Sequence, residues 1–196
     1  GNRRGNAMIS LGKKWFGGDA EEERDGLADL RLETMRNGDL VDYDLKTWEV
    51  TGRSAYDYEG FPAQEWQLTS GNDVCFLERS EEDGKTEWIL TRSIDVGDIQ
   101  EDVTAALTAD EDPPAVIHFQ NRTYEATESS AGVQTDLADD GSTVAGSGRE
   151  FISWSYEGEE RRVLFLAQWG EQRFTAYEGE QVEEYSFTDI LPGGER

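Results

Sequence analysis

The chain has 196 residues, with 43 Asp and Glu against 18 Lys and Arg, which gives a formal net charge of −25 at pH 7. With 36% hydrophobic residues, including six Trp, it has enough apolar surface for a packed core. No run approaches the roughly 18 apolar residues of a membrane span, and no segment has the pattern of a cleaved export signal, so we expect a cytoplasmic protein. We do not expect the protein to bind nucleic acid, because the body of the chain has no basic patch to neutralise phosphates.

The acidic residues are spread over the whole chain, and only four of the basic residues are lysines: Lys13, Lys14, Lys46 and Lys85. This composition is typical of proteins from salt-in halophiles, where molar salt shortens the Debye length to about 3 Å and screens the repulsion between carboxylates. There are two alternatives to this interpretation: an acidic protein of an ordinary cell, and a surface that mimics nucleic acid. The halophilic interpretation predicts a fold that needs salt.

Residues 1–19 form a basic and apolar leader that we expect to be flexible. Its functional interpretation is a weak contact with a membrane surface through Lys13, Lys14, Trp15 and Phe16. The alternative is a frayed terminus that packs on its own domain, because so short a segment carries little apolar area.

Residues 20–37 are predicted to form one amphipathic helix. Leu27, Leu30 and Met35 recur at helical spacing, and acidic residues gather at the start, where the helix dipole favours them. Asn37 and Gly38 then end the helix.

From residue 38 the hydrophobic period changes toward two, which indicates a first β repeat over 38–112. Its strand-like runs are "LVDYD", "TWEVTGRSAYDY", "EWQLTS", "DVCFLERS" and "TEWILTRS". The stretches 69–73 and 81–85 are predicted hairpin connections, since Gly, Asn and Asp supply the positive φ of tight turns. A short helix is predicted within 98–107.

Residues 113–196 are predicted to form a second β repeat that resembles the first. The alignment places Trp48 on Tyr124, and it places "EWQLT" on "EFISW", so that Trp66 falls on Phe151. A long polar connection at 129–148 interrupts this half, and we predict it to be disordered, with a binding role as the alternative.

The predicted fold is therefore mainly β. We expect two similar antiparallel meander sheets packed as a sandwich or as partly open barrels, with one N-terminal helix.

Residues that carry chemistry are few. His118 is the only histidine, which excludes catalytic His pairs, and Cys75 lies within a strand as a small apolar residue. No spacing of a metal site, phosphate loop or nucleophile elbow occurs, so we expect no cofactor and no metal, and the sequence leans against an enzyme without deciding the question.

The aromatic residues near the Pro62 turn are the remaining candidates for a site. Most large rings should point into the core, whereas a surface aromatic group marks a ligand or partner site. The predicted site consists of Tyr56, Tyr58, Phe61, Glu65 and Trp66.

Short motifs in residues 38–92 resemble the bacterial and archaeal family called domain of unknown function 4178. A Gly-Asp opens a strand, an aromatic-x-Val-x-Gly follows, and a Trp-containing strand precedes one with Leu and Glu. The matching positions are Gly38, Asp39, Trp48, Val50, Gly52, Glu65, Trp66, Leu77 and Glu78. A weaker similarity continues to about residue 191.

The resemblance implies a small accessory protein without catalytic residues. Relatives in this family are found in company with phage-shock-type membrane-stress proteins and polyamine-synthesis enzymes. We therefore expect a non-enzymatic protein-interaction module linked to membrane or envelope stress, whose partner belongs to such an assembly. The alternative is a binder of a small polyamine-like cation, or an associated enzyme, because cations suit an acidic aromatic pocket.

Overall fold

The computed structural model describes residues 30–109 and 112–194, and it is mainly β. The first half contains β1 (Leu40–Tyr43), β2 (Lys46–Tyr58), β3 (Phe61–Ser70), β4 (Asp73–Glu82) and β5 (Lys85–Ile94). The second half contains β6 (Val116–Phe119), β7 (Arg122–Asp136), β8 (Arg149–Gly158), β9 (Arg162–Trp169), β10 (Arg173–Val182) and β11 (Thr188–Leu191). The described residues also contain one α-helix, α2 (Val103–Thr108), and the 3-10 turns η1 (Leu32–Thr34), η2 (Val96–Asp98) and η3 (Glu184–Ser186).

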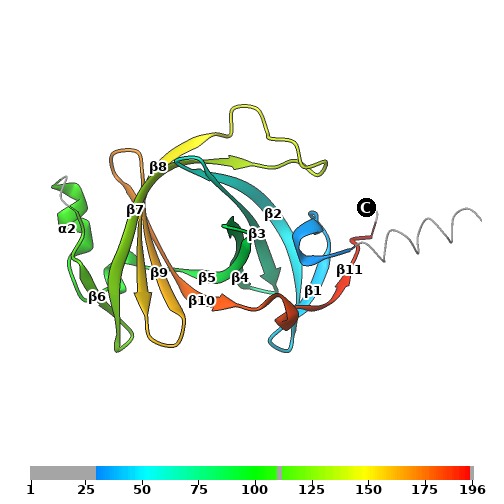
Figure 1. The fold of residues 1–196 in the computed structure, drawn as a ribbon, viewed down its shortest axis with the longest axis horizontal. Helices are drawn as coiled ribbons and strands as arrows, with labels where there is room; N and C mark the ends of the chain where they lie inside the picture. The colour runs from blue at the N-terminus through cyan, green and yellow to red at the C-terminus, as the bar shows by residue number, and fades with distance from the viewer. Residues whose placement is uncertain (1–29, 110–111, 195–196) are drawn as a thin grey trace, which may run out of the picture.

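A closed antiparallel barrel of 8 strands forms the centre of the molecule (Figure 1). Neighbouring strands pair in the order β2, β3, β4, β5, β10, β9, β8 and β7, and β7 pairs back with β2. β1 and β11 extend the sheet beyond β2, and β6 extends it beyond β7. The strands β1 to β5 and β6 to β10 thus pair in the same order, and three junctions join the two halves: β5 with β10, β2 with β7, and β1 with β11.

A β-bulge divides each of the two longest strands. The register of β2 against β3 shifts between Val50 and Gly52, and that of β7 against β8 shifts between Ala126 and Glu128. Before its bulge β2 pairs with β1, whereas residues 54–58 pair with β7. A bulge inserts one extra residue and so reverses which side chains point to a given face. Each long strand therefore belongs to an outer sheet at one end and to the barrel wall at the other.

Two hydrophobic cores lie on the outer face of the barrel wall. One is built around Trp48, Trp66 and Leu77, and it is covered by Leu32 of η1, by Met35 and by Phe187, which follows η3. The other is built around Tyr124 and Tyr156, and residues of α2 and β6 cover it. Figure 1 shows α2 and β6 on one side of the barrel and β1 and β11 on the opposite side. The apolar interior of this protein is therefore outside the barrel, in two separate layers.

The predicted sandwich or pair of partly open barrels is replaced by one closed barrel. The physical reason is that β2 and β7, the long strand of each half, pair with each other through Ser54–Tyr58 and Gly132–Asp136. This pairing satisfies the backbone groups of both strand ends, which would otherwise form exposed edges.

The predicted helix over 20–37 lies mostly outside the described residues, as does the predicted leader, 1–19. From residue 30 onward the structure has only the 3-10 turn Leu32–Thr34 where a helix was predicted. Met35 is extended, with φ −56° and ψ 142°, and its carbonyl accepts a hydrogen bond of 3.0 Å from Trp66 Nε1. This tertiary contact holds the backbone in a non-helical path.

The predicted polar connection at 129–148 is also shorter than expected, because β7 continues to Asp136. The remaining loop carries a bridge between Leu137 and Thr143, and Asp139 Oδ1 accepts a hydrogen bond of 2.8 Å from Asn37 Nδ2. The short helix predicted within 98–107 is present as α2. No helix in residues 30–109 or 112–194 has the length and apolar character needed to span a membrane.

Candidate functional site

The inside of the barrel contains a cavity of about 430 Å³. Each of the barrel strands contributes side chains to its wall. The residues that line its inner part are Tyr56, Tyr58, Ala63, Glu65, Glu78, Ser80, Thr91, Phe151, Ser153, Phe165, Ala167, Trp169 and Tyr177. We call this space the lumen.

The bulge in β2 places two tyrosines in the lumen. Strict alternation would put Tyr56 and Tyr58 on the same face as Trp48 and Val50, which are buried in an outer core. The extra residue of the bulge reverses the alternation, so that both rings point inward instead.

Two carboxyl groups lie beside each other on the lumen wall. Glu65 of β3 and Glu78 of β4 are directly paired in the antiparallel ladder. Cβ atoms of such pairs are about 4.5–5.5 Å apart, and like charges at this spacing are destabilising. The two carboxylates therefore repel each other, at a cost in stability, whenever both groups are ionised.

A tyrosine hydroxyl donates to each carboxyl group. Tyr56 Oη donates to Glu65 Oε1 at 3.2 Å, and Tyr58 Oη donates to Glu78 Oε2 at 2.9 Å. Gln134 Nε2 in turn donates to Tyr56 Oη at 2.6 Å. These contacts orient both carboxyl groups along the wall.

The environment strongly favours the neutral form of both carboxyl groups. Desolvation within the barrel, together with the charge of Glu78, raises the pKa of Glu65 from 4.5 to about 8. Desolvation also raises the pKa of Glu78 from 4.5 to about 7, although the hydrogen bond from Tyr58 opposes the change. Both side chains keep partial solvent contact because they line a cavity. The lumen thus holds two carboxyl groups that change charge near neutral pH.

Aromatic rings form the wall next to these groups. The rings of Tyr56 and Tyr58 stack with centroids 5.5 Å apart, and both meet the ring of Phe151 edge-on at 5.7 and 5.4 Å. Trp169 packs on Phe151 with centroids 5.0 Å apart. Such rings offer negative π-faces to a cation.

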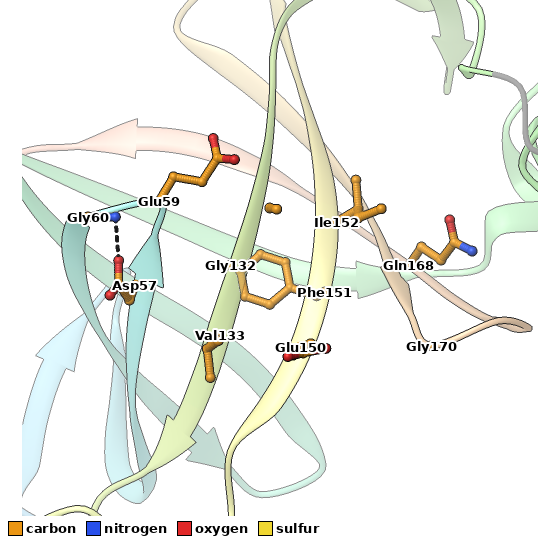
Figure 2. A pocket seen from close by; sticks show the side chains of 11 residues that line it. Asp57, Glu59, Gly60, Gly132, Val133, Glu150, Phe151, Ile152, Gln168 and Gly170 are labelled. Carbon is orange, nitrogen blue, oxygen red and sulfur yellow. Dashed lines mark hydrogen bonds between the residues drawn. The ribbon is translucent and has the colours of Figure 1, made fainter.

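Phe151 also separates the lumen from a shallow groove of about 520 Å³ on the outer surface (Figure 2). Its ring lies beside Gly132 on the neighbouring strand, where a Cβ atom would come within 2.6 Å of the ring. Asp57, Val133 and Ile152 line the groove. The absence of a side chain at Gly132 makes room for the ring.

The structure brings four of the five predicted site residues together. Tyr56, Tyr58, Phe61 and Glu65 line the cavity, with Phe61 mostly exposed at its rim. Trp66 does not belong to this group: it points to the opposite face, is 0% exposed and packs in an outer core. The predicted membrane-contact residues Lys13, Lys14, Trp15 and Phe16 lie outside the described residues.

Sequence reasoning missed Glu78, Phe151 and Trp169. A signal for Glu78 was present. Neighbouring residues of a strand point to opposite faces, so if Trp66 and Leu77 are buried on one face, Glu65 and Glu78 share the other. Phe151 and Trp169 come from the other half of the chain, and only the closure of the barrel places them beside Tyr56.

The chemical character of the lumen follows from the side chains that line it. Carboxyl groups, phenols and aromatic rings line it, and no Lys, Arg, His or Cys is found among the described residues that line the lumen. The described part of the chain also contains no group of three or more His, Cys, Asp or Glu that could hold a metal ion.

Comparison with known proteins places the chain among uncharacterised relatives. It is 26% identical over 181 residues to an uncharacterised protein of Aquifex aeolicus (strain VF5), which covers 92% of this chain and 96% of that protein. No solved structure matches the chain significantly. The model of the family described as domain of unknown function (DUF4178) matches residues 36–184, which include both halves of the barrel. The chain therefore belongs to this family, as its strand and turn motifs predicted.

Proposed function

We propose that the barrel binds a small organic amine, whose ammonium group lies between Glu65 and Glu78 and against the rings of Tyr56, Tyr58 and Phe151. The observation that carries this proposal is the direct pairing of two carboxyl groups inside a cavity. Their mutual repulsion is relieved when a cation enters between them. The aromatic wall adds cation–π attraction, which grows when the cation is desolvated.

The charge of the cavity supports a cation over an anion. Further carboxyl groups lie toward one mouth of the cavity: Glu81, Glu82, Glu87 and Glu128. Arg79 pairs with Glu81 at 3.1 Å, but no basic side chain is found among the described residues that line the cavity itself. An anionic ligand would meet repulsion along this whole wall.

Binding must be coupled to proton release. The free carboxyl groups have pKa values of about 8 and 7, whereas a bound ammonium favours their ionised forms. Affinity should therefore rise between about pH 6 and pH 9, and it should fall only when the amine loses its own proton near pH 10. A neutral ligand that accepts hydrogen bonds from protonated carboxyl groups would show the opposite dependence.

Calorimetric titration with 1-butylamine and 1,4-diaminobutane tests the proposal, with 1-butanol as the neutral control. We expect binding of the amines at pH 9, weaker binding at pH 6, and at least about tenfold loss of affinity in the double variant Glu65→Gln, Glu78→Gln, equal to about 1.4 kcal/mol. Glu150→Gln is the matched control, because this carboxyl group lies on the outer face beside Phe151. Equal binding of butanol, or unchanged affinity in the double variant, would exclude an amine site at this pair.

The protein-interaction module linked to membrane stress stays a prediction from the family resemblance, as does the cytoplasmic location. Both are compatible with amine binding, since a ligand in the lumen would then act as the signal that such a module reports.

A further inference from the structure

A smaller cavity lies next to the lumen. A second cavity of about 140 Å³ shares four lining residues with the first: Tyr56, Glu65, Trp169 and Tyr177. The same four side chains line both spaces, so the two cavities adjoin one another at these residues. The smaller cavity differs in charge, since Arg149 and Arg173 also line it.

The two kinds of charge lie at opposite ends of the barrel. The acidic mouth is formed by the β4–β5 hairpin, which carries Glu81, Glu82 and Glu87. β5 runs from this hairpin to Ile94, and Ile94 pairs with Ala176 near the start of β10. Arg173 begins β10 and therefore lies at the other end.

Arg149 lies at this same end. It begins β8, and it lines the smaller cavity together with Arg173. Both arginines also act on the lumen electrostatically: they oppose the rise in the pKa of Tyr177 that desolvation causes, and Arg149 opposes the rise in the pKa of Glu65. The acidic mouth of the lumen and the two guanidinium groups of the smaller cavity thus lie at opposite ends of the barrel.

The guanidinium groups are not neutralised to the same extent. Arg149 Nη2 is 2.9 Å from Asp136 Oδ1, and both side chains are 48% exposed. Arg173 forms no ion pair with any residue in the described ranges. At least one guanidinium fork therefore remains available to a carboxylate or phosphate group of a ligand.

We propose that the ligand is zwitterionic: its ammonium group lies at Glu65 and Glu78, and an anionic group at its other end lies at Arg149 and Arg173. This inference rests on the proposed amine binding and specifies the second end of the ligand. A simple diamine would place a second cation beside the two guanidinium groups, or it would have to turn its free end toward the acidic mouth.

The groups that face the carboxyl pair come from several strands. Tyr56 and Tyr58 of β2 donate to it, Glu87 of β5 acts on Glu78, and Arg149 of β8 acts on Glu65. Among these groups only the arginines attract an anion. The anionic end of the ligand should therefore point toward the end of the barrel at which the arginines lie.

A matched set of four-carbon ligands tests the inference by calorimetric titration at pH 9 and fixed salt. The set comprises 4-aminobutanoate, 1-butylamine, 1,4-diaminobutane and butanoate, with the six-carbon homologues to allow for the distance between the two ends. We expect the amino acid of suitable length to bind at least about tenfold more tightly than the monoamine and the diamine. Butanoate alone should not compete.

Arg173→Gln should reduce the affinity for the amino acid to that for the monoamine, and it should not weaken monoamine binding, because a positive charge is removed from the neighbourhood of the ammonium group. Arg173→Glu should reverse the preference and favour the diamine. Asp136→Asn should strengthen binding of the amino acid, since it frees Arg149. Arg161→Gln is the control, because this exposed arginine pairs with Glu183 outside both cavities.

Tighter binding of the diamine than of every amino acid tested would overturn the zwitterion and leave the amine site standing. Unchanged amino-acid affinity in Arg173→Gln and in Arg173→Glu would also overturn it. If no amine binds at either pH, the proposed function itself fails, which separates the two conclusions.

Discussion

The two faces of the β3–β4 ladder differ in almost every physical property. On the outer face Trp66 pairs with Leu77, both are 0% exposed, and Trp66 packs on Trp88 with ring centroids 5.7 Å apart. On the inner face, one residue away, Glu65 pairs with Glu78 beside a cavity. The outer face thus supplies the burial that stabilises the fold. The inner face is left free to hold groups that cost stability, as functional sites commonly do.

The largest effect should come from salt, which acts on both faces. A net charge of −25 destabilises the compact state unless ions screen it. We expect the midpoint of thermal unfolding to fall by about 20 °C or more between 2 M KCl and dilute buffer, on the order of 5 kcal/mol or more for a chain of this size. Circular dichroism in both conditions checks this, with sucrose in place of salt as the non-ionic control. Equal midpoints would refute the halophilic interpretation.

Removing a ring from the outer face should have the next largest effect. Trp66→Ala leaves a cavity in the core and frees the Met35 carbonyl that Trp66 Nε1 contacts, so we expect a loss of about 3–5 kcal/mol in the free energy of unfolding. Trp169→Ala, on the lumen face, should cost clearly less, because its ring borders a cavity already. Urea unfolding compares the two variants. Similar losses would show that the two faces contribute equally to stability.

Neutralising the carboxyl pair should stabilise the fold, with a definite pH dependence. Because the folded pKa of Glu65 is about 8 and its ordinary value is 4.5, the folded state holds more protons than the unfolded state between these values, and stability falls as pH rises through this window. We expect Glu65→Gln to gain about 2–4 kcal/mol at pH 9 and almost nothing at pH 4, since one pKa unit corresponds to about 1.4 kcal/mol.

Urea unfolding of Glu65→Gln at both pH values measures this gain, with Glu150→Gln on the outer face as the matched control. A gain that is the same at pH 4 and pH 9 would contradict the assigned pKa, because it would have a cause other than ionisation.

The smallest of these effects should come from a substitution in the barrel wall, at Gly132, where β7 pairs with β2. A Cβ atom at position 132 would lie 2.6 Å from both the Asp57 backbone oxygen and Phe151 Cζ, so Gly132→Ala should shift the ring or the strand and cost about 1–3 kcal/mol. Gly148→Ala is the control, since its Cβ atom would meet nothing closer than Val133 Cγ1 at 3.8 Å. Equal urea midpoints for the two variants would show that the β2–β7 junction tolerates a wider spacing.

The strands and hairpins could be predicted from the sequence because their causes are local. The predicted connections at 69–73 and 81–85 are present, with φ of 61° at Gly71, 50° at Asp83 and 75° at Gly84. Trp66 and Leu68, two residues apart on β3, both lie in an outer core, as the period of two requires. Periodicity of two and turn chemistry act within a few residues, so one sequence is sufficient to read them.

Closure of the barrel could not be predicted, because it depends on pairing between distant residues. The bulge that turns Tyr56 and Tyr58 inward leaves no local signature beyond a Gly in the strand. The inclusion of Trp66 with Glu65 in one site was wrong for a local reason: adjacent strand residues point to opposite faces.

The internal repeat stays a prediction, which the equal strand order of the halves supports. Trp48 and Tyr124, aligned in the sequence, both lie two residues before a bulge. The alignment of Trp66 with Phe151 is wrong by three residues, because Trp154 occupies the equivalent ladder position. The long connection before β8 leaves the alignment of this strand without a fixed starting point, so the shift could not be seen in the sequence.

The junction between β2 and β7 has a consequence for how the chain folds. Every other pairing in the barrel except β5 with β10 links strands that are consecutive in sequence, and these can form as hairpins within microseconds. The pairing of Ser54 with Asp136 must instead wait until most of the intervening chain is ordered. Closing so long a loop costs conformational entropy, and the contacts that compensate for this cost form only afterwards. We therefore expect ring closure to be the slow, late step of folding. Until it occurs, the edges of both long strands are open to pairing with another molecule, which makes the unclosed barrel the species most prone to aggregate.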